Sequence, residues 1–393
     1  MQLLHLIINA LLFGLCYTLT NHAAEAAQVQ RTLAISFEQS IPFLPWMIIP
    51  YASSGPLLAW AFFKVRKGDA LRVYSRRLML STVAASLIFA VFPARFPAGR
   101  AVPEHAFLQF AYGLLDASDR PYNQFPSLHI TYCILLWLAL RPAIASRPWR
   151  TALACWLLLV GASTLLTWQH AVADIAGGIA LAAIACHAVR PGATARQSVS
   201  FYYAVMAGLA LLAAALFAPA WPWLYLAAST ALVAMAYARR NAAFLRKDQG
   251  RHPGWIWLLF WPYLAGYAAT WLLVRWRHRG KPPFAKATEG LWVGRRLSAG
   301  EAQHLPPGCS IIDLSAELSE TEALRRGRYR HLPLMDLQAP SRQQVRTVLA
   351  AIDTERRQGR PVYLHCAMGY SRSLFIARIY LHSYTSCAFR STS

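Results

Sequence analysis

Two histidines and an aspartate are candidates for catalysis because of their side chains and their positions in the chain. His129 ends the segment FPSLH, and His170 follows it in the chain, four residues before Asp174. Residues four apart share one face of a helix, so the carboxylate of Asp174 could orient the imidazole of His170 and stabilise its protonated form. His170 could then attack phosphorus as a nucleophile, and His129 could protonate the leaving oxygen.

Polar groups near these histidines are candidates for binding the phosphate itself. Three hydroxyl side chains could donate hydrogen bonds to its non-bridging oxygens: Ser127, Ser163 and Thr164. Three cations could stabilise the charged transition state, and the sequence does not choose among them: Arg95, Arg100 and Arg120. A single histidine near lipid headgroups is usually only a polar surface residue. An ionisable pair within an apolar run is rare and indicates function.

A cysteine and an arginine form the second candidate site. An apolar strand, a glycine-containing loop and the start of a helix follow one another in residues 361–373, PVYLHCAMGYSRS. Backbone N–H groups of such a loop can surround a phosphate, aided by the helix N-terminus. The same field and the guanidinium of Arg372 would favour the thiolate of Cys366. That thiolate would attack phosphorus while Arg372 binds two phosphate oxygens.

Other residues near Cys366 complete this second site. Gly369 permits close approach of the backbone, Ser371 is a further phosphate-binding candidate, and Ser373 would ease departure of the thiolate. Asp336 lies thirty residues upstream, in a proline-flanked loop that could reach the leaving oxygen as a general acid. The alternatives are a structural cysteine at position 366 and a turn residue at 336. Asp313 is expected to support the fold. Histidine, thiolate and arginine supply nucleophile and charge, so neither site is expected to use a metal or a cofactor.

The elements that position these residues are largely apolar. Of the 393 residues, 56% are apolar and 14% are charged, against about 45–50% and about 25% in soluble domains. A helix crosses a bilayer with about 20 apolar residues. The candidate crossings are 3–20, 43–63, 78–92, 130–140, 151–167, 175–189, 201–217 and 221–238. We therefore expect an all-α polytopic membrane helix bundle.

The distribution of basic residues orients these helices. Alternate loops hold sixteen lysines and arginines on one side and four on the other. The richer side is expected to be cytoplasmic, which places the N-terminus inside and makes the chain a multi-pass protein of the cell inner membrane. A ninth stretch, 255–274, contains Pro262, Gly266 and four tryptophans. It is expected to lie in the interface or to re-enter the membrane, with the C-terminal region in the cytoplasm.

Other classes of function are disfavoured. The net charge of +22 accompanies long uncharged stretches, which indicates basic loops between membrane helices and no nucleic-acid partner. The seven cysteines form no CxxC pair, so neither a disulfide framework nor a zinc site is expected.

The composition changes near residue 281, after a linker with Gly280, Pro282 and Pro283. Short strands at 310–314 and 362–364 and an amphipathic helix at 342–351 predict a small α/β domain. We therefore divide the chain into 1–200, a membrane domain; 201–280, additional transmembrane or interfacial helices; and 281–393, the α/β domain.

The membrane motifs resemble those of a known superfamily. FPSLH followed by ST-x5-H-x3-D is similar to the type-2 phosphatidic acid phosphatases, particularly their inositol phosphorylceramide synthase-like branch, over roughly residues 43–189. The resemblance implies a core of six helices that acts on lipid phosphates. His129 would be the leaving-group acid, His170 the nucleophile and Asp174 its orienting residue. The phosphatase branch has arginine where this chain has Thr164, and the synthase-like branch shares the threonine. The acceptor is therefore left open between water and a lipid hydroxyl.

The segment HCxxGxxRS resembles the dual-specificity phosphatases of the cysteine-dependent tyrosine phosphatase superfamily, from about residue 290 to 381. Such domains usually continue for several helices, whereas twelve residues follow Leu381 here, so a shortened domain is expected. Together the two halves resemble bacterial fusions of a phosphatidic acid phosphatase-type membrane domain with a dual-specificity phosphatase domain.

Three functions are compatible with these features. The first is a membrane phosphatase with a His/His/Asp site for a phospholipid, isoprenoid or sphingolipid phosphate and a cytoplasmic Cys-dependent phosphomonoesterase site. The tail would act on a phosphoprotein or a phosphoinositide. The second is a lipid phosphotransferase, and the third is a tail that binds phosphate without catalysis.

Overall fold

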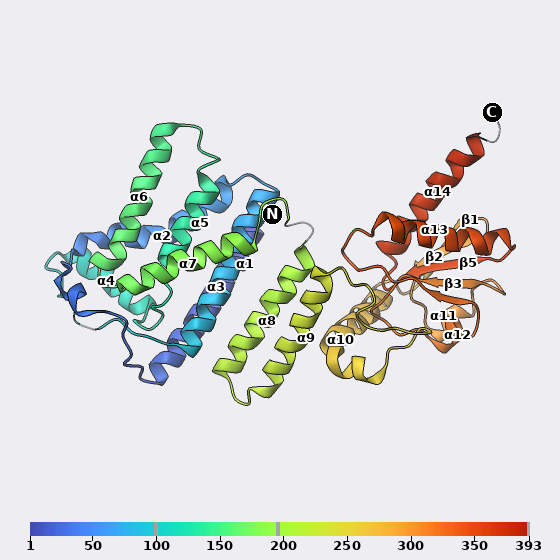
Figure 1. Cartoon of the computed structure of the whole chain (residues 1–393), viewed down its shortest axis with the longest axis horizontal. Helices are drawn as coiled ribbons and strands as arrows, with labels where there is room; N and C mark the ends of the chain where they lie inside the picture. Colours follow the sequence, from blue (N-terminus) through green and yellow to red (C-terminus); the bar gives the residue numbers. More distant parts are fainter. Residues whose placement is uncertain (98, 100, 194–196, 391–393) are drawn as a thin grey trace. The chain divides into compact units, whose positions relative to one another are not determined.

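The chain folds into two compact units in the computed structural model, which describes residues 1–97, 99, 101–193 and 197–390, with the side chains of 118 and 384–390 left out (Figure 1). The first unit comprises Met1–Ser198 with Ala204–Ala227, and the second comprises Val199–Tyr203 with Ala228–Ser393. The first is helical, and the second is a mixed α/β domain with helices at its N-terminal side. The predicted fold class is confirmed.

The first unit is built from helices around an apolar core. In chain order they are α1 (Gln2–Ala26), short 3-10 turns at Ser36–Ser40 and Pro45–Met47, α2 (Ile48–Lys64), α3 (Asp69–Val91), α4 (Ala106–Ser118), α5 (Leu128–Leu140), α6 (Arg147–Leu166) and α7 (Val172–Ala188). The helices α8 (Ser198–Leu216) and α9 (Trp221–Ala238) follow. The core joins α2, α3, α5, α6 and α7.

Four of the described helices are long and apolar enough to cross a membrane: α1, α6, α8 and α10 (Gly254–Arg277). The chain is therefore a membrane-associated protein; the number of crossings stays a prediction. Two expectations need correction. The helix α4 was missed, because Gln109 and Asp116 interrupt its apolar residues. The run 78–92 is only the end of α3, so Arg72, Arg76 and Arg77 lie on a helix and not in a loop.

The helices α5 and α7 approach closely at Gly178. The hydroxyl of Thr131 donates a hydrogen bond to the carbonyl oxygen of Gly178 at 2.9 Å, and the N–H of Ser127 donates to the carbonyl of Asp174 at 3.0 Å. A Cβ atom at position 178 would lie 2.6 Å from the carbonyl oxygen of Ser127. Glycine at this position therefore sets the distance between the first turns of the two helices.

The second unit contains a five-stranded sheet. Its strands are β1 (Phe284–Thr288), β2 (Leu291–Arg295), β3 (Ser310–Asp313), β4 (Tyr329–His331) and β5 (Val362–Cys366), in the order β1-β2-β5-β3-β4. The pair β1–β2 is antiparallel and the other pairs are parallel. The parallel strands therefore end at one edge of the sheet, where α/β proteins place their ligands.

Helices cover both faces of this sheet. The helices α13 (Arg342–Arg357) and α14 (Arg372–Arg390) pack on the face of Val362 and Leu364, and α11 (Ala299–Ala302) and α12 (Glu322–Arg325) lie with the face of Tyr363. The side chains of alternate residues in β5 therefore point to opposite faces of the sheet. The predicted strands 310–314 and 362–364 and the predicted helix 342–351 are confirmed.

The tryptophan-rich stretch forms α10, which is kinked at Phe260, where φ is −117°. The ring of Pro262 clashes with the carbonyl four residues earlier and kinks the helix here. The interfacial or re-entrant placement predicted for this stretch concerns the membrane and stays a prediction.

Substitution of Gly178 by alanine should destabilise the first unit. The added methyl group would push α5 and α7 apart and cost about 1–3 kcal/mol of the free energy of unfolding. Thermal unfolding in detergent measures this effect. The matched control is Gly14→Ala in α1, where a Cβ atom meets nothing within 4 Å. Equal unfolding temperatures of the two variants would contradict the close approach of α5 and α7.

Candidate functional sites

Asp174 lies in the first turn of α7, whereas His170 lies just before the helix, so the two residues do not share a helix face as the spacing predicted. Nδ1 of His170 is 3.3 Å from Oδ2 of Asp174, and the N–H of Ala171 donates a hydrogen bond to the same oxygen at 2.8 Å. Asp174 is completely buried and His170 is 5% exposed. The carboxylate therefore caps the helix and holds Nδ1 of His170, which leaves Nε2 for other chemistry.

The second histidine comes from the first turn of α5. The ring centroid of His129 lies 5.9 Å from that of His170, edge to face, and the ring of Tyr51 from α2 stacks on His129 at 4.3 Å. The structure thus brings together the three residues that the sequence analysis singled out. Their roles stay predictions.

Both imidazoles line a cavity of about 960 Å³ in the first unit. Most of its lining is apolar, including Phe13, Leu58 and Leu114, and its polar lining includes Asn9, Asp119 and Asn123 beside the histidines. Lipid tails fit such a lining, because burying them removes apolar surface from water.

The three hydroxyl groups predicted to bind phosphate have other partners here. Ser127 begins α5, and its oxygen accepts a hydrogen bond from the N–H of Ile130. Ser163 and Thr164 donate to the carbonyls of Val160 and Gly161, one turn earlier in α6. All three are fully buried, so binding a phosphate through them requires these hydrogen bonds to be exchanged.

Two of the three candidate arginines, Arg95 and Arg120, lie among the described residues. Arg95 donates a hydrogen bond to the side chain of Gln30 at 3.0 Å, and Arg120 forms an ion pair with Glu25. Arg100 lies outside the described residues. Neither described arginine lines the cavity that holds the two histidines.

Asp119 is a further acidic residue near the two histidines, and it was not among the predicted site residues. Its carboxylate lines the cavity and accepts hydrogen bonds from the hydroxyl of Tyr17 at 3.0 Å and the amide of Asn21 at 3.1 Å. No sequence pattern singles out Asp119, because its partners Tyr17 and Asn21 lie about 100 residues earlier in the chain.

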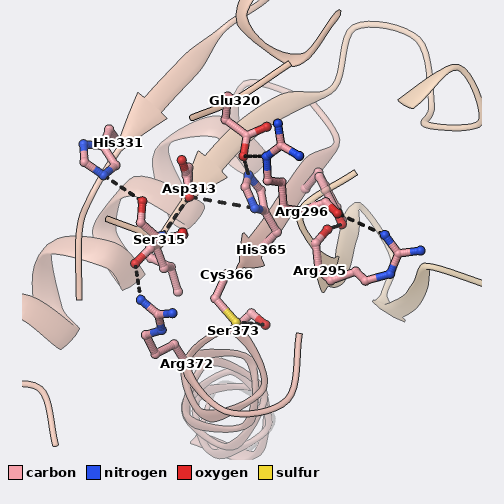
Figure 2. Close-up of polar contacts among 12 residues, drawn as sticks. Arg295, Arg296, Asp313, Ser315, Glu320, His331, His365, Cys366, Arg372 and Ser373 are labelled. Atoms are coloured by element: carbon pink, nitrogen blue, oxygen red, sulfur yellow. Dashed lines mark hydrogen bonds and ion pairs between the residues drawn. The ribbon is translucent and has the colours of Figure 1, made fainter. Parts of the chain in front are cut away.

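The cysteine site lies at the carboxyl end of the central strand β5. The sulfur of Cys366 is 3.3 Å from the hydroxyl oxygen of Ser373 at the start of α14 (Figure 2). The hydroxyl of Ser373 also donates to the carbonyl of Gly294. Gly369 has a φ of +76°, and a Cβ atom there would lie 3.0 Å from the nitrogen of Arg295. Only glycine suits this position. Ser371, in the same loop, is exposed.

The guanidinium of Arg372 is held by a carboxylate that the sequence analysis missed. Its Nη1 atom lies 3.0 Å from both carboxylate oxygens of Glu317 and donates to the carbonyl of Leu334 at 2.9 Å. Burial raises the pKa of Glu317, and the positive charge of Arg372 opposes that shift. Glu317 follows β3 by four residues, and the spacing alone offers no distinctive signal for it.

The predicted general acid lies beside this arginine. Oδ1 of Asp336 is 3.3 Å from Nε of Arg372, and the hydroxyl of Tyr267 in α10 donates to Oδ2 at 3.0 Å. Its side chain is 17% exposed. Cys366, Arg372 and Asp336, which are dispersed in the sequence, therefore meet at one edge of the sheet.

A cluster of buried charged side chains lies on the face of β5 opposite to Cys366. His365 points away from the cysteine, with Nδ1 3.8 Å from Asp313 and Nε2 3.9 Å from Glu320 (Figure 2). The ammonium of Lys247 lies 2.5 Å from Oδ2 of Asp313. Burial acts to raise the pKa of Asp313, but the charges of Lys247 and His365 prevail and lower it.

Asp313, Glu320 and His365 are the group among the described residues whose atoms are close enough to hold a metal ion. The arrangement fits a metal poorly, because Lys247 already supplies a cation to Asp313 and the two carboxylates face different imidazole nitrogens. Asp313 therefore acts within the fold, in agreement with its predicted role.

Comparison with protein families identifies both halves. Residues 46–188 match the PAP2 superfamily, and residues 310–383 match a family described as polymorphic toxin system, DSP-PTPase phosphatase. The comparisons with curated proteins and with solved structures give no match. The matched regions hold the His129–His170–Asp174 group and the Cys366–Arg372–Asp336 group. Both families indicate hydrolysis of phosphoric monoesters. The two matched regions together correspond to a fusion of a PAP2 superfamily domain with a DSP-PTPase phosphatase domain.

Proposed function

We propose that the protein is a membrane phosphatase with two independent sites. The convergence of His129 and His170 beside the carboxylate of Asp174, at an apolar cavity, supports a lipid phosphate as substrate of the first site. The neighbouring Cys366, Arg372 and Asp336 support phosphomonoester hydrolysis of the dual-specificity type at the second. We further propose that the protein lies in the cell inner membrane with its C-terminal domain in the cytoplasm.

At the membrane site, Nε2 of His170 attacks phosphorus while His129 donates its proton to the departing lipid oxygen. The bond from phosphorus to that oxygen breaks as the bond from nitrogen to phosphorus forms. Water, deprotonated by His129, then attacks the phosphohistidine and releases inorganic phosphate. The charge of Asp174 stabilises the imidazolium throughout.

At the cysteine site, the sulfur of Cys366 attacks phosphorus and Asp336 protonates the leaving oxygen. Arg372 and the backbone N–H groups of the loop hold the phosphate oxygens. Hydrolysis of the phosphocysteine regenerates the thiol group, and the hydroxyl of Ser373, 3.3 Å from the sulfur, stabilises the departing thiolate. Phosphate binding draws Arg372 from Asp336, which frees the carboxyl group for proton transfer.

The threonine at position 164, which the synthase-like branch shares, favours lipid phosphotransfer as a second candidate for the membrane site. The mostly apolar cavity of about 960 Å³ suits the tails of a lipid donor in either reaction. Vesicles containing a labelled phospholipid and a lipid alcohol distinguish the two reactions. A labelled phospholipid product indicates transfer, whereas free phosphate indicates hydrolysis.

The substitution His170→Ala should abolish release of phosphate from phosphatidic acid in vesicles and leave hydrolysis of p-nitrophenyl phosphate unchanged. Cys366→Ser should have the reverse effect, since each variant removes one nucleophile. The matched controls are His187→Ala on the exposed end of α7 and Cys309→Ser in the tail. Aryl phosphatase activity that survives in Cys366→Ser would overturn the assignment of the second site.

The substitution Glu317→Gln should lower kcat for p-nitrophenyl phosphate by about 10–100-fold. It removes a charged hydrogen bond worth about 1.5–3 kcal/mol, and Arg372 then loses its fixed orientation. Glu322→Gln, an exposed acid that pairs with Arg326, is the control. A fall in kcat equal for both variants would show that Glu317 does not position Arg372. Thermal unfolding checks that the variant is folded.

A further inference from the structure

The helix α10 contacts the phosphatase domain along almost its whole length. Near its N-terminal end, Phe260 and Leu264 pack in one cluster with Ala316 and Met335. Further along, Tyr267 bonds to Asp336, the indole N–H of Trp271 donates to the carbonyl of Arg296 at 2.9 Å, and Arg275 lies 3.5 Å from Glu301. At its C-terminal end, the side chain of His278 is 2.9 Å from the hydroxyl of Tyr370.

These contacts conflict with a membrane crossing by α10. From Phe260 to His278 the helix rises about 27 Å, close to the 30 Å or so of a bilayer core. A helix that crossed the bilayer would carry Asp336, Arg296 and Glu301 into hydrocarbon, where charged groups are costly. The phosphatase domain therefore requires α10 to remain at a surface that water reaches.

The opposite side of α10 is apolar and exposed. We call this side the lipid face, and its large residues are Trp255, Leu258, Trp261, Leu272, Leu273 and Trp276. Tryptophan favours the headgroup region, and an exposed apolar patch of this kind marks an interaction surface. Exposed cations at the end of the helix, Arg277, Arg279 and Lys281, complement anionic headgroups.

The cysteine site is attached to this same helix. Asp336 accepts a hydrogen bond from Tyr267, and Tyr370, in the loop between Cys366 and Arg372, contacts His278. Exposed apolar side chains lie next to these two contacts in the sequence: Leu337 is 75% exposed, Tyr370 55% and Leu374 40%. A membrane surface in contact with the lipid face therefore lies about one helix diameter, roughly 10–12 Å, from these two contacts.

We propose that α10 lies in the plane of the membrane surface and holds the Cys366 site near the level of the headgroups, where its substrate is a phosphate monoester on a lipid headgroup. The placement of α10 rests on its contacts alone. The substrate rests in addition on the phosphatase function proposed for Cys366. Placement at the membrane surface would not bring a soluble phosphopeptide closer to Cys366.

Depth measurements test the placement without catalysis. Single cysteines are introduced as Trp261→Cys, Ala269→Cys and Trp276→Cys in full-length protein whose other cysteines are serine, and depth-dependent quenching of a fluorescent label is measured in vesicles. All three labels should lie at one depth, about 5–10 Å into the headgroup boundary. A crossing helix would separate the first and last by about 22 Å and overturn the proposal. Trp149→Cys and Leu158→Cys in α6 provide a comparison along a candidate crossing.

Activity measurements test the substrate. The protein carries His170→Ala so that only the cysteine site acts, and the substrate is phosphatidylinositol monophosphate in vesicles of phosphatidylcholine and phosphatidylglycerol. Adding Leu272→Glu on the lipid face should lower kcat/KM for this substrate at least tenfold and leave p-nitrophenyl phosphate hydrolysis unchanged. Ala350→Glu, an exposed position on α13, is the control for added charge.

The outcomes separate the two proposals. Hydrolysis of a soluble phosphotyrosine peptide in preference to the vesicle lipid, with no effect of Leu272→Glu on either, would overturn the lipid substrate. Absence of p-nitrophenyl phosphate hydrolysis in the unsubstituted protein would refute the Cys366 chemistry. The depth of α10 would still be decided by the labels.

Discussion

Both sites depend on the unpaired N–H groups that begin a helix. A helix leaves its first N–H groups without partners, and these groups must be capped or must bind an anion. Ser127 and Asp174 cap α5 and α7; His129 lies in the first turn of α5, and His170 lies just before α7. Cys366 and its loop lead into the first turn of α14. The three residues predicted to act in catalysis therefore all lie near helix N-termini, and those of α5 and α7 are occupied by side-chain caps.

Buried charge is balanced differently in the two units. In the membrane site, Asp174 is paired with His170, and Asp119 is satisfied by the neutral groups of Tyr17 and Asn21. In the tail, Glu317 pairs with Arg372 and Asp313 with Lys247. An unpaired charge in either place would be costly, which accounts for the pairing of these carboxylates.

Two residues from the segment before the α/β domain contact carboxylates within that domain. Lys247 and Tyr267 both precede the α/β domain, yet they reach Asp313 and Asp336 within it. The α/β domain and the segment before it therefore form one structural unit. The contact of Asp336 with Tyr267 therefore joins the cysteine site to an apolar helix.

The amino-acid sequence by itself determined the apolar helices, the strands 310–314 and 362–364, the helix 342–351 and the motifs around His129, His170 and Cys366. These features are local, because helix and strand periodicity and short motifs involve neighbouring residues. Four features are visible only in the folded protein: the helix α4, the contact of Glu317 with Arg372, the contact of Tyr267 with Asp336, and the position of Asp119 at the apolar cavity. Those partners lie far apart in the chain, and their pairing follows from packing and from the need to compensate buried charge, which no local pattern records.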